Sequence, residues 1–254
     1  MLKVVVIGSG NVAQHLITVF EQSAKVELVQ AYARHPKHIA HLLPASKITV
    51  DVNYLAEADA YIIAVTDDAI AEVSTQLPFT GRLVVHTSGS VAMEQLSANN
   101  RRGVFYPLQT FSKNKAVNFK QVPLCIEAEN EADMQLLEQL ATAVSDNVYH
   151  ISSVQRQALH VAAVFVSNFT NHMYTLGHNI CRENNISFNI LKPLIQETAA
   201  KVMELEPAQA QTGPAARHDA ATIQRHLNFL EDENQKTIYK LLTDSIQNIN
   251  VKEL

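Results

Sequence analysis

The sequence predicts an α/β fold with a doubly wound, mostly parallel sheet, followed by an all-α C-terminal domain. Three observations predict it. Apolar runs of strand length alternate with segments of helical spacing as far as about residue 151. The first apolar run leads directly into the motif GxGxxA at residues 8–13. Beyond residue 153 the pattern is helical throughout. We therefore expect one domain over 1–151 and a second over 152–254.

The glycine motif is typical of a Rossmann-type dinucleotide site. Gly8 allows the tight turn, Gly10 lets the backbone approach a pyrophosphate, and Ala13 keeps the next helix close to the strand. Main-chain N–H groups at the start of that helix then face the phosphates. The predicted phosphate-binding residues are Gly8, Ser9, Gly10, Asn11 and Val12. The alternative is an ordinary glycine turn between a strand and a helix.

The second strand, residues 26–33, indicates which nucleotide binds. The residue that contacts the ribose in this fold lies at the carboxyl end of that strand. Glu27 lies at the other end, roughly 20 Å from the expected ribose. The carboxyl end instead carries Ala33 and Arg34, and an arginine fork suits a 2′-phosphate. The predicted cofactor is therefore NADP, as NADPH, with a solvated loop cation as the alternative role of Arg34.

Short strands and helices fill the rest of the first domain. The other predicted strands are apolar runs over residues 48–50, 60–65, 83–86, 104–106, 122–126 and 147–151. The predicted helices have apolar residues three and four apart, over 12–20, 36–43, 70–77 and 134–140, with a helical turn at 54–57. Pro36 opens its helix at a position where proline is favoured. The count fits a doubly wound sheet with an extension.

Two loops of this domain are expected to line the cofactor, because ligands bind outside the carboxyl ends of parallel strands. One loop carries Val65 and Thr66, and Asp67 or Asp68 is expected to cap the helix that follows. The other loop carries His86 and Thr87. Of the candidate catalytic residues, His86 is the one expected nearest to the nicotinamide, with a structural histidine as the alternative.

The composition excludes several classes of partner. With 20 Lys+Arg against 25 Asp+Glu and a net charge of −5, the chain has no electrostatic footprint for nucleic acid or an anionic membrane. Cys125 and Cys181 have no metal-type spacing, so we predict no metal site. A core strand stands where a signal peptide would be, so we expect a cytoplasmic protein that acts on a small molecule.

Residues 157–181 contain no Asp, Glu, Lys or Arg. Their length would suit a membrane span, but three histidines and three asparagines would each need a partner in lipid. We therefore expect a long helix buried on most sides in protein. At 100° per residue its polar side chains form a band about 40° wide, made up of His160, Ser167, Asn171 and His178, with Asn168 beside it.

This polar band fits two interpretations, a cleft wall beside a ligand or a hydrogen-bonding seam between helices or subunits. For a cleft wall, His160 is the candidate proton donor, since an imidazole titrates near neutral pH. Ser167, Asn168 and Asn171 would then orient the substrate. A later loop with Gly213 and Pro214 at its centre adds Arg217, either a clamp for a substrate carboxylate or a member of a structural ion pair.

The rest of the second half is predicted as three more helices. The first is capped by Ser187 and continues to about residue 203, and the second is capped by Asp219. The last begins near Asp232. An excess of apolar residues over 157–203 predicts a homodimer through this half.

Five motifs occur in order along nearly the whole chain: GSGNVA at 8–13, HTSG at 86–89, YPLQTFS at 106–112, AAVFVSNF at 162–169 and TGPAAR at 212–217. With them the chain resembles the bacterial Rossmann-like NADP oxidoreductases that carry a C-terminal helical domain of unknown function. More distantly it is similar to pyrroline-5-carboxylate reductases, deazaflavin-dependent NADP reductases and β-hydroxyacid dehydrogenases.

The resemblance implies an N-terminal NADP-binding domain and a helical domain that closes the active site and often pairs two subunits. The chain departs from these relatives at two points. Tyr106 stands where the family usually has histidine, and the long helix lacks the catalytic lysine of the β-hydroxyacid dehydrogenases. The mechanism of those dehydrogenases is therefore not carried over to this chain.

The first functional hypothesis is an NADP-dependent oxidoreductase that moves hydride between nicotinamide and a small carbonyl or imine compound. A second hypothesis is a sensor or partner protein that binds NADP(H) without turnover, motivated by the missing lysine. A third is a reductase that exchanges hydride with a deazaflavin.

Overall fold

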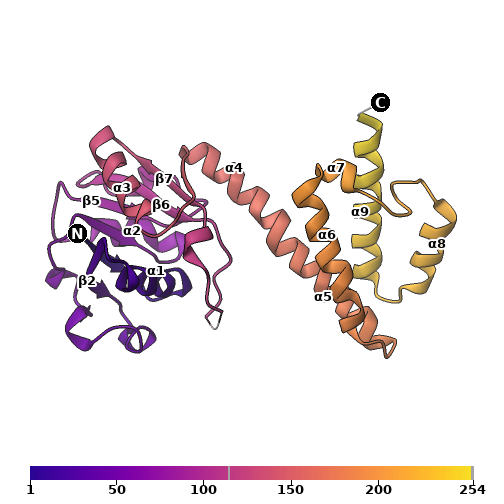
Figure 1. Ribbon diagram of the computed structural model, residues 1–254, viewed down its shortest axis with the longest axis horizontal. Coiled ribbons are helices and arrows are strands. Elements are labelled where there is room, and N and C mark those ends of the chain that lie inside the picture. Colours follow the sequence, from indigo (N-terminus) through magenta and orange to yellow (C-terminus); the bar gives the residue numbers. More distant parts are fainter. Residues whose placement is uncertain (114, 253–254) are drawn as a thin grey trace. The chain divides into compact units, whose positions relative to one another are not determined.

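The computed structural model describes residues 1–113 and 115–252, with side chains to residue 248. The chain divides into two compact units, Met1–Asn168 and Phe169–Leu254 (Figure 1). The first unit contains the sheet, and the second is helical. Helix α4 (Ser153–Ala163), which the sequence analysis counts with the C-terminal domain, belongs by its contacts to the first unit.

The first unit is built around an eight-stranded sheet in the order β3-β2-β1-β4-β5-β6-β7-β8. The strands are β1 (Leu2–Ile7), β2 (Val26–Tyr32), β3 (Ile48–Thr49), β4 (Ala60–Ile63), β5 (Leu83–His86), β6 (Arg101–Pro107), β7 (Leu124–Ala128) and β8 (Val148–His150). The first six are parallel in the order typical of a dinucleotide-binding fold. Strand β7 runs antiparallel to β6, and β8 parallel to β7. The predicted fold class is confirmed.

Alternate residues of β1 enter the two halves of the core, as the period of a strand requires. Val4 and Val6 pack on one face of the sheet with α1 (Asn11–Gln22) and α3 (Glu131–Thr142). Val5 and Ile7 pack on the other face with α2 (Ile70–Thr75). The strands are therefore apolar on both faces, as expected for parallel strands that helices cover on both sides.

Two local predictions in this unit are wrong. The helix expected over 36–43 is a single 3-10 turn, η1 (Pro36–His38), and Pro44 disfavours helical backbone in the residue before it. Asp67 and Asp68 do not cap a helix, because they lie inside a further 3-10 turn, η4 (Asp67–Ala69), that precedes α2. No side chain makes a capping hydrogen bond at the start of η4 or at the start of α2. Further 3-10 turns are η2 (Ala45–Lys47), η3 (Val52–Tyr54), η5 (Met93–Gln95) and η6 (Phe119–Gln121).

The long uncharged segment forms α4, a π-helical turn η7 (Val164–Phe169) and α5 (Thr170–Glu183). The π turn hydrogen-bonds over five residues instead of four, so a 100° wheel does not hold across it. The expected burial on most sides is also wrong for a single chain. The side chains of Val161 and Val166 are 58% and 75% exposed among the residues that the structure describes.

The second unit continues with η8 (Phe188–Leu191), α6 (Lys192–Glu204), α7 (Pro207–Ala210), α8 (Ala220–Phe229) and α9 (Glu233–Lys252). The predicted cap at Asp219 is confirmed, because its carboxylate accepts the Thr222 N–H at 3.0 Å. Ser187 likewise accepts from Asn189, at the start of η8. Among the residues described, we find no helix with the length and hydropathy needed to cross a membrane.

Candidate functional site

The turn between β1 and α1 requires a glycine at residue 8. Gly8 has a φ of +142°, and a Cβ built there would lie 2.1 Å from the carbonyl oxygen of Ala64, at the end of β4. The Gly8 N–H donates to the carbonyl of Tyr32 at 2.9 Å. The turn is therefore packed tightly against the ends of the two neighbouring strands.

Gly10 leaves the start of α1 open. It is the N-cap residue, and no side chain caps this helix. A Cβ built on Gly10 would find no atom within 4 Å. The first turn of α1 contains no acidic residue. The main-chain N–H groups of this turn therefore face open space without a negative side chain, which is the arrangement that binds a phosphate.

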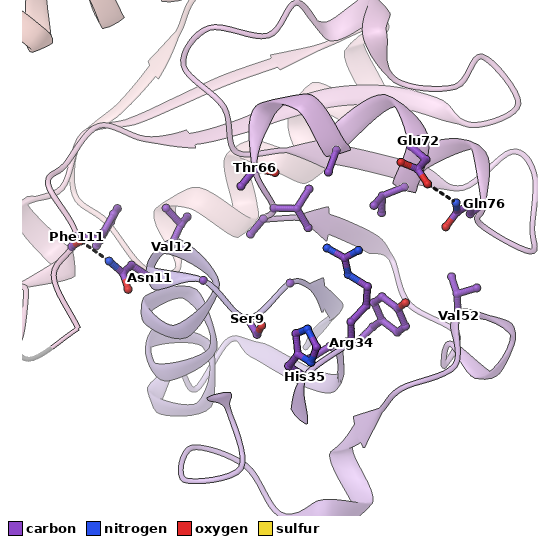
Figure 2. A pocket seen from close by; sticks show the side chains of 18 of the residues that line it. Ser9, Asn11, Val12, Arg34, His35, Val52, Thr66, Glu72, Gln76 and Phe111 are labelled. Carbon is purple, nitrogen blue, oxygen red and sulfur yellow. Dashed lines mark hydrogen bonds between the residues drawn. The ribbon is translucent and has the colours of Figure 1, made fainter. Parts of the chain in front are cut away.

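A cavity of about 540 Å³ extends from this turn across the carboxyl ends of the parallel strands (Figure 2). Nine of the ten predicted cofactor-binding residues line it: Gly8, Ser9, Gly10, Asn11, Val12, Ala33, Arg34, Val65 and Thr66. Thr87 does not line it, and its N–H and hydroxyl both donate to the carbonyl of Ile63. The structure thus brings together residues from the loops after β1, β2 and β4.

Arg34 extends into this cavity with an exposed guanidinium group (Figure 2). No ion pair or hydrogen bond holds that group among the residues that the structure describes. An unpaired arginine fork beside the end of β2 is where the 2′-phosphate of NADP would need a cation. Glu27 lies at the opposite end of β2, where it is the register neighbour of Lys3 in β1.

Several lining residues were not predicted. Four residues that line the cavity lie on one face of the segment that includes α2: Ala69, Glu72, Val73 and Gln76. Their spacing of three, four and seven residues was a usable signal, because it places them on one face of a helix that follows a cofactor strand. Gln109 and Phe111 come from the motif after β6. There the Asn11 side chain donates to the Phe111 carbonyl at 3.0 Å, which ties this segment to α1.

His86 is fully buried at the end of β5. Its Nδ1 accepts the N–H of Ser88 at 3.1 Å, while Nε2 has no partner among the described residues. Burial, and then the positive charge of Arg156, lower the pKa of His86 to about 4. The imidazole is therefore neutral near pH 7, and no part of it reaches the surface of the unit.

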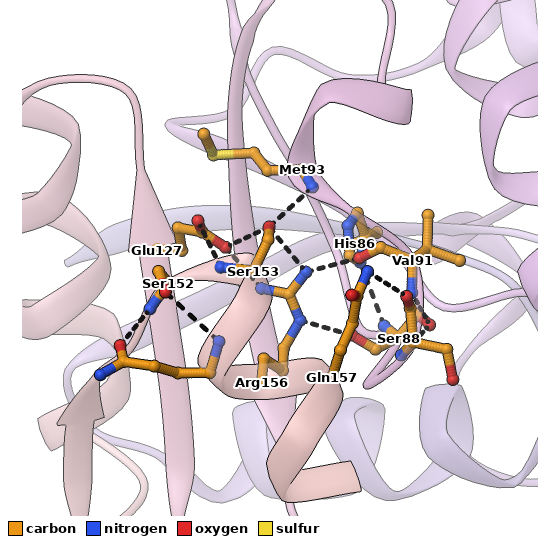
Figure 3. Close-up of polar contacts among 11 residues, drawn as sticks. His86, Ser88, Val91, Met93, Glu127, Ser152, Ser153, Arg156 and Gln157 are labelled. Atoms are coloured by element: carbon orange, nitrogen blue, oxygen red, sulfur yellow. Dashed lines mark hydrogen bonds and ion pairs between the residues drawn. The ribbon is translucent and has the colours of Figure 1, made fainter. Parts of the chain in front are cut away.

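Arg156, in the first turn of α4, is also fully buried (Figure 3). Its guanidinium pairs with Glu127 of β7 at 2.5 Å and donates to the carbonyls of Ser88 and Val91. Glu127 in turn accepts from the N–H and hydroxyl of Ser153. This hydrogen-bonded ion pair fixes the start of α4 against the sheet and against the loop after β5. This ion pair was not predicted from the sequence, although Arg156 directly precedes the uncharged segment.

His160 lies one helical turn after Arg156. Its Nδ1 is 3.0 Å from the hydroxyl of Tyr106 at the end of β6. The imidazole also lies against Gly89 in the loop after β5. The structure therefore places the candidate proton donor at the carboxyl ends of β5 and β6, within the first unit.

The other candidate catalytic residues are divided between the two units. Ser167 is half-buried and Asn168 exposed on the π turn, at the end of the first unit. Asn171 and Arg217 belong to the second unit, and both are exposed. Arg217 forms no ion pair within the described residues, so the structural ion pair weighed for it does not occur there. Nor do the described residues include three His, Cys, Asp or Glu side chains grouped to hold a metal ion.

The fold and the cavity define a dinucleotide-binding protein of the Rossmann class. Residues 3–89 match the family "NADP oxidoreductase coenzyme F420-dependent", and residues 122–246 match the "Domain of unknown function (DUF2520)". A "putative NADP oxidoreductase" from Bacteroides fragilis is 39% identical, with a TM-score of 0.87 over 97% of this chain and 98% of that one. The chain belongs to this family, the NADP oxidoreductases with a C-terminal DUF2520 domain.

More distant structures share the fold. A protein from Thermotoga maritima is 18% identical, with a TM-score of 0.75 over 98% of this chain and 99% of that one. A reductive aminase from Aspergillus terreus, in complex with NADPH and ethyl levulinate, is 14% identical, with a TM-score of 0.71 over 98% and 94%. The search of the curated proteins gave no match.

Proposed function

We propose that the protein is an NADPH-dependent oxidoreductase that transfers hydride between the nicotinamide and a small carbonyl or imine compound. The observation that supports it best is the cavity in which uncapped N–H groups of α1 and an unpaired Arg34 face the same space. These groups would hold the diphosphate and the 2′-phosphate. When bound, the nicotinamide supplies the hydride, and the protein supplies orientation and proton handling.

The cofactor preference can be tested on binding alone. Arg34→Ala should weaken NADPH binding by about 1 to 3 kcal/mol, as expected for a lost charged hydrogen bond. NADH, which lacks the 2′-phosphate, should bind almost unchanged. Lys37→Ala is the matched control, because Lys37 is an exposed cation nearby that does not line the cavity. Equal losses of NADPH and NADH affinity in Arg34→Ala would refute the assignment.

We propose that His160, and not His86, supplies the proton to the substrate. His160 lies at the ends of two central strands and is partly exposed, whereas His86 has no exposed atom. Ser167, Asn168 and Asn171 would orient the substrate, and Arg217 would bind an acidic group on it. His160→Asn should lower turnover by roughly 10² or more, the usual contribution of a general acid. His41→Asn, a change of an exposed histidine, should not.

The reaction class can be tested by following NADPH absorbance with a panel of keto acids, cyclic imines and flavin-like acceptors. Oxidation by a keto acid or imine would support the proposal. The match of residues 3–89 to a coenzyme F420-dependent family supports a second candidate, hydride exchange with a deazaflavin. Turnover with a deazaflavin alone would favour that candidate, and tight NADPH binding without turnover across the panel would favour a sensor.

A homodimer through the helical unit is part of the proposal. The apolar side chains of Ile190, Leu194 and Met203 are 70%, 61% and 85% exposed in the single chain. Exposed apolar surface of this kind marks an interaction site. We expect light scattering at micromolar concentration to give twice the chain mass of 28.1 kDa. A mass of one chain would remove this part of the proposal.

We also propose a cytoplasmic location, which cell fractionation tests.

A further inference from the structure

Three parts of the first unit meet at the imidazole of His160. Tyr106 reaches it from β6, Gly89 from the loop after β5, and His160 itself comes from α4. The phenol and imidazole rings are 6.0 Å apart between centroids and inclined by 67°, so the phenol meets the imidazole edge-on. The hydroxyl of Tyr106 lies 3.0 Å from Nδ1.

The imidazole has little freedom to move away from this contact. A Cβ built on Gly89 would lie 2.4 Å from Nδ1 and 2.7 Å from Cγ of His160, and 2.9 Å from Cζ of Tyr106. The loop backbone therefore packs directly against both rings. One turn earlier, the buried Arg156 holds α4 by its ion pair with Glu127. Both the ring and the helix that carries it are thus fixed within the same unit.

The Tyr106 hydroxyl has one evident acceptor. Tyr106 is 8% exposed, and its hydroxyl has no other hydrogen-bond partner among the described residues. Burial raises the pKa of Tyr106 to about 12, so the hydroxyl keeps its proton near neutral pH. A buried hydroxyl normally donates when an acceptor lies within reach. In a neutral imidazole that accepts at Nδ1, the ring proton is on Nε2.

We propose that Tyr106 is a positioning residue, which donates to Nδ1 of His160 and thereby keeps the transferable proton on Nε2. The value of this arrangement for catalysis rests on the proposed function, in which His160 supplies a proton to the substrate. Nε2 has no partner among the described residues, so it is the nitrogen left for a ligand. A neutral His160 with its proton on Nδ1 would have none on Nε2 to give. When Nε2 gives its proton to the substrate, the hydroxyl proton of Tyr106 passes to Nδ1, so the ring stays neutral, and the Tyr106 oxygen regains a proton from solvent.

The test is the tautomer of His160, read by long-range nitrogen–proton correlation NMR on the full-length protein labelled with ¹⁵N-histidine. The His160 signals are assigned from their loss in His160→Asn. In the wild type at a pH where the ring is neutral, we expect a protonated Nε2 and an unprotonated Nδ1. In Tyr106→Phe, which removes only the hydroxyl, we expect a mixture of both tautomers. Tyr149→Phe is the matched control, because the Tyr149 side chain on β8 is half-exposed, and it should leave the His160 signals unchanged.

Two results would overturn the inference: a proton on Nδ1 in the wild type, or an unchanged tautomer in Tyr106→Phe. The wild-type spectrum tests it even where the variant does not fold. With an active substrate, Tyr106→Phe should lower kcat at least tenfold with a nearly unchanged Kd for NADPH. If the tautomer behaves as expected but His160→Asn keeps full turnover, the proposed role of His160 fails and the assignment of Tyr106 stands.

Discussion

The two compact units bury their side chains to very different extents. In the first unit, strands β4 and β5 are buried along their whole length. In the second unit, the described side chains up to residue 248 include only four buried ones, Cys181, Ala215, Gln235 and Thr243. Large apolar side chains such as Phe229 and Leu241 are more than 60% exposed there. The sheet unit therefore contains its own core, whereas the described side chains of the helical unit form almost none within a single chain.

The largest expected effect is at Gly8, where the packing of the first unit is closest. Gly8→Ala should destabilise the protein by about 4 kcal/mol or more, because the new Cβ meets the Ala64 carbonyl oxygen and the backbone is in a region rare for L-residues. Urea unfolding measures it. Gly10→Ala, where the Cβ meets open space, should change stability by less than about 1 kcal/mol. Equal effects at both positions would contradict the close packing at residue 8.

The next effect is expected at the buried ion pair. Glu127→Ala leaves the Arg156 guanidinium buried without its counter-ion and should cost about 3 to 5 kcal/mol of unfolding free energy. The exposed pair of Arg82 and Glu57 provides the control, and Glu57→Ala should cost less than about 1 kcal/mol. The same urea titration serves for both variants. A cost for Glu127→Ala as small as that of the control would mean that the interior of the first unit tolerates an unpaired charge.

Acid should destabilise the first unit through His86. The pKa of His86 is about 4 in the folded chain, against an ordinary value of 6.5. As the pH falls, the unfolded chain therefore takes up a proton on His86 before the folded chain does. The stability present above pH 6.5 is therefore lost as the pH falls toward 4, by an amount on the order of 3 kcal/mol. Unfolding free energies measured across this window check it. His86→Gln should flatten the pH dependence, and His38→Gln, an exposed change, should leave it as it is.

The smallest effect is expected in the helical unit, where there is room. Gly177 lies inside α5, and the nearest atom to a Cβ built there is Cδ1 of Leu191, at 3.9 Å. Gly177→Ala should stabilise the protein by about 0.5 to 1 kcal/mol, because alanine loses less backbone entropy in a helix. Thermal unfolding at one protein concentration measures it. A loss of stability would contradict the open space around residue 177.

Much of the sheet could be predicted from the sequence because its signals are local. Strand β5 has the predicted bounds, and the turn at Gly8 follows from the strand and motif beside it. The contacts around His160 are not local. Arg156 and Glu127 are 29 residues apart, and Tyr106 and His160 are 54 apart. Nothing in the spacing of such residues indicates that the topology brings them together.

The buried ion pair has a practical consequence for anyone who wishes to isolate the cofactor-binding half. A fragment ending at residue 151, where the strand and helix alternation stops, would lack Ser153 and Arg156 and would expose the carboxylate of Glu127. It would also lose the backbone contacts that the guanidinium makes with residues 88 and 91. A shortened protein suited to crystallisation or titration with nucleotides should therefore retain residues through 168.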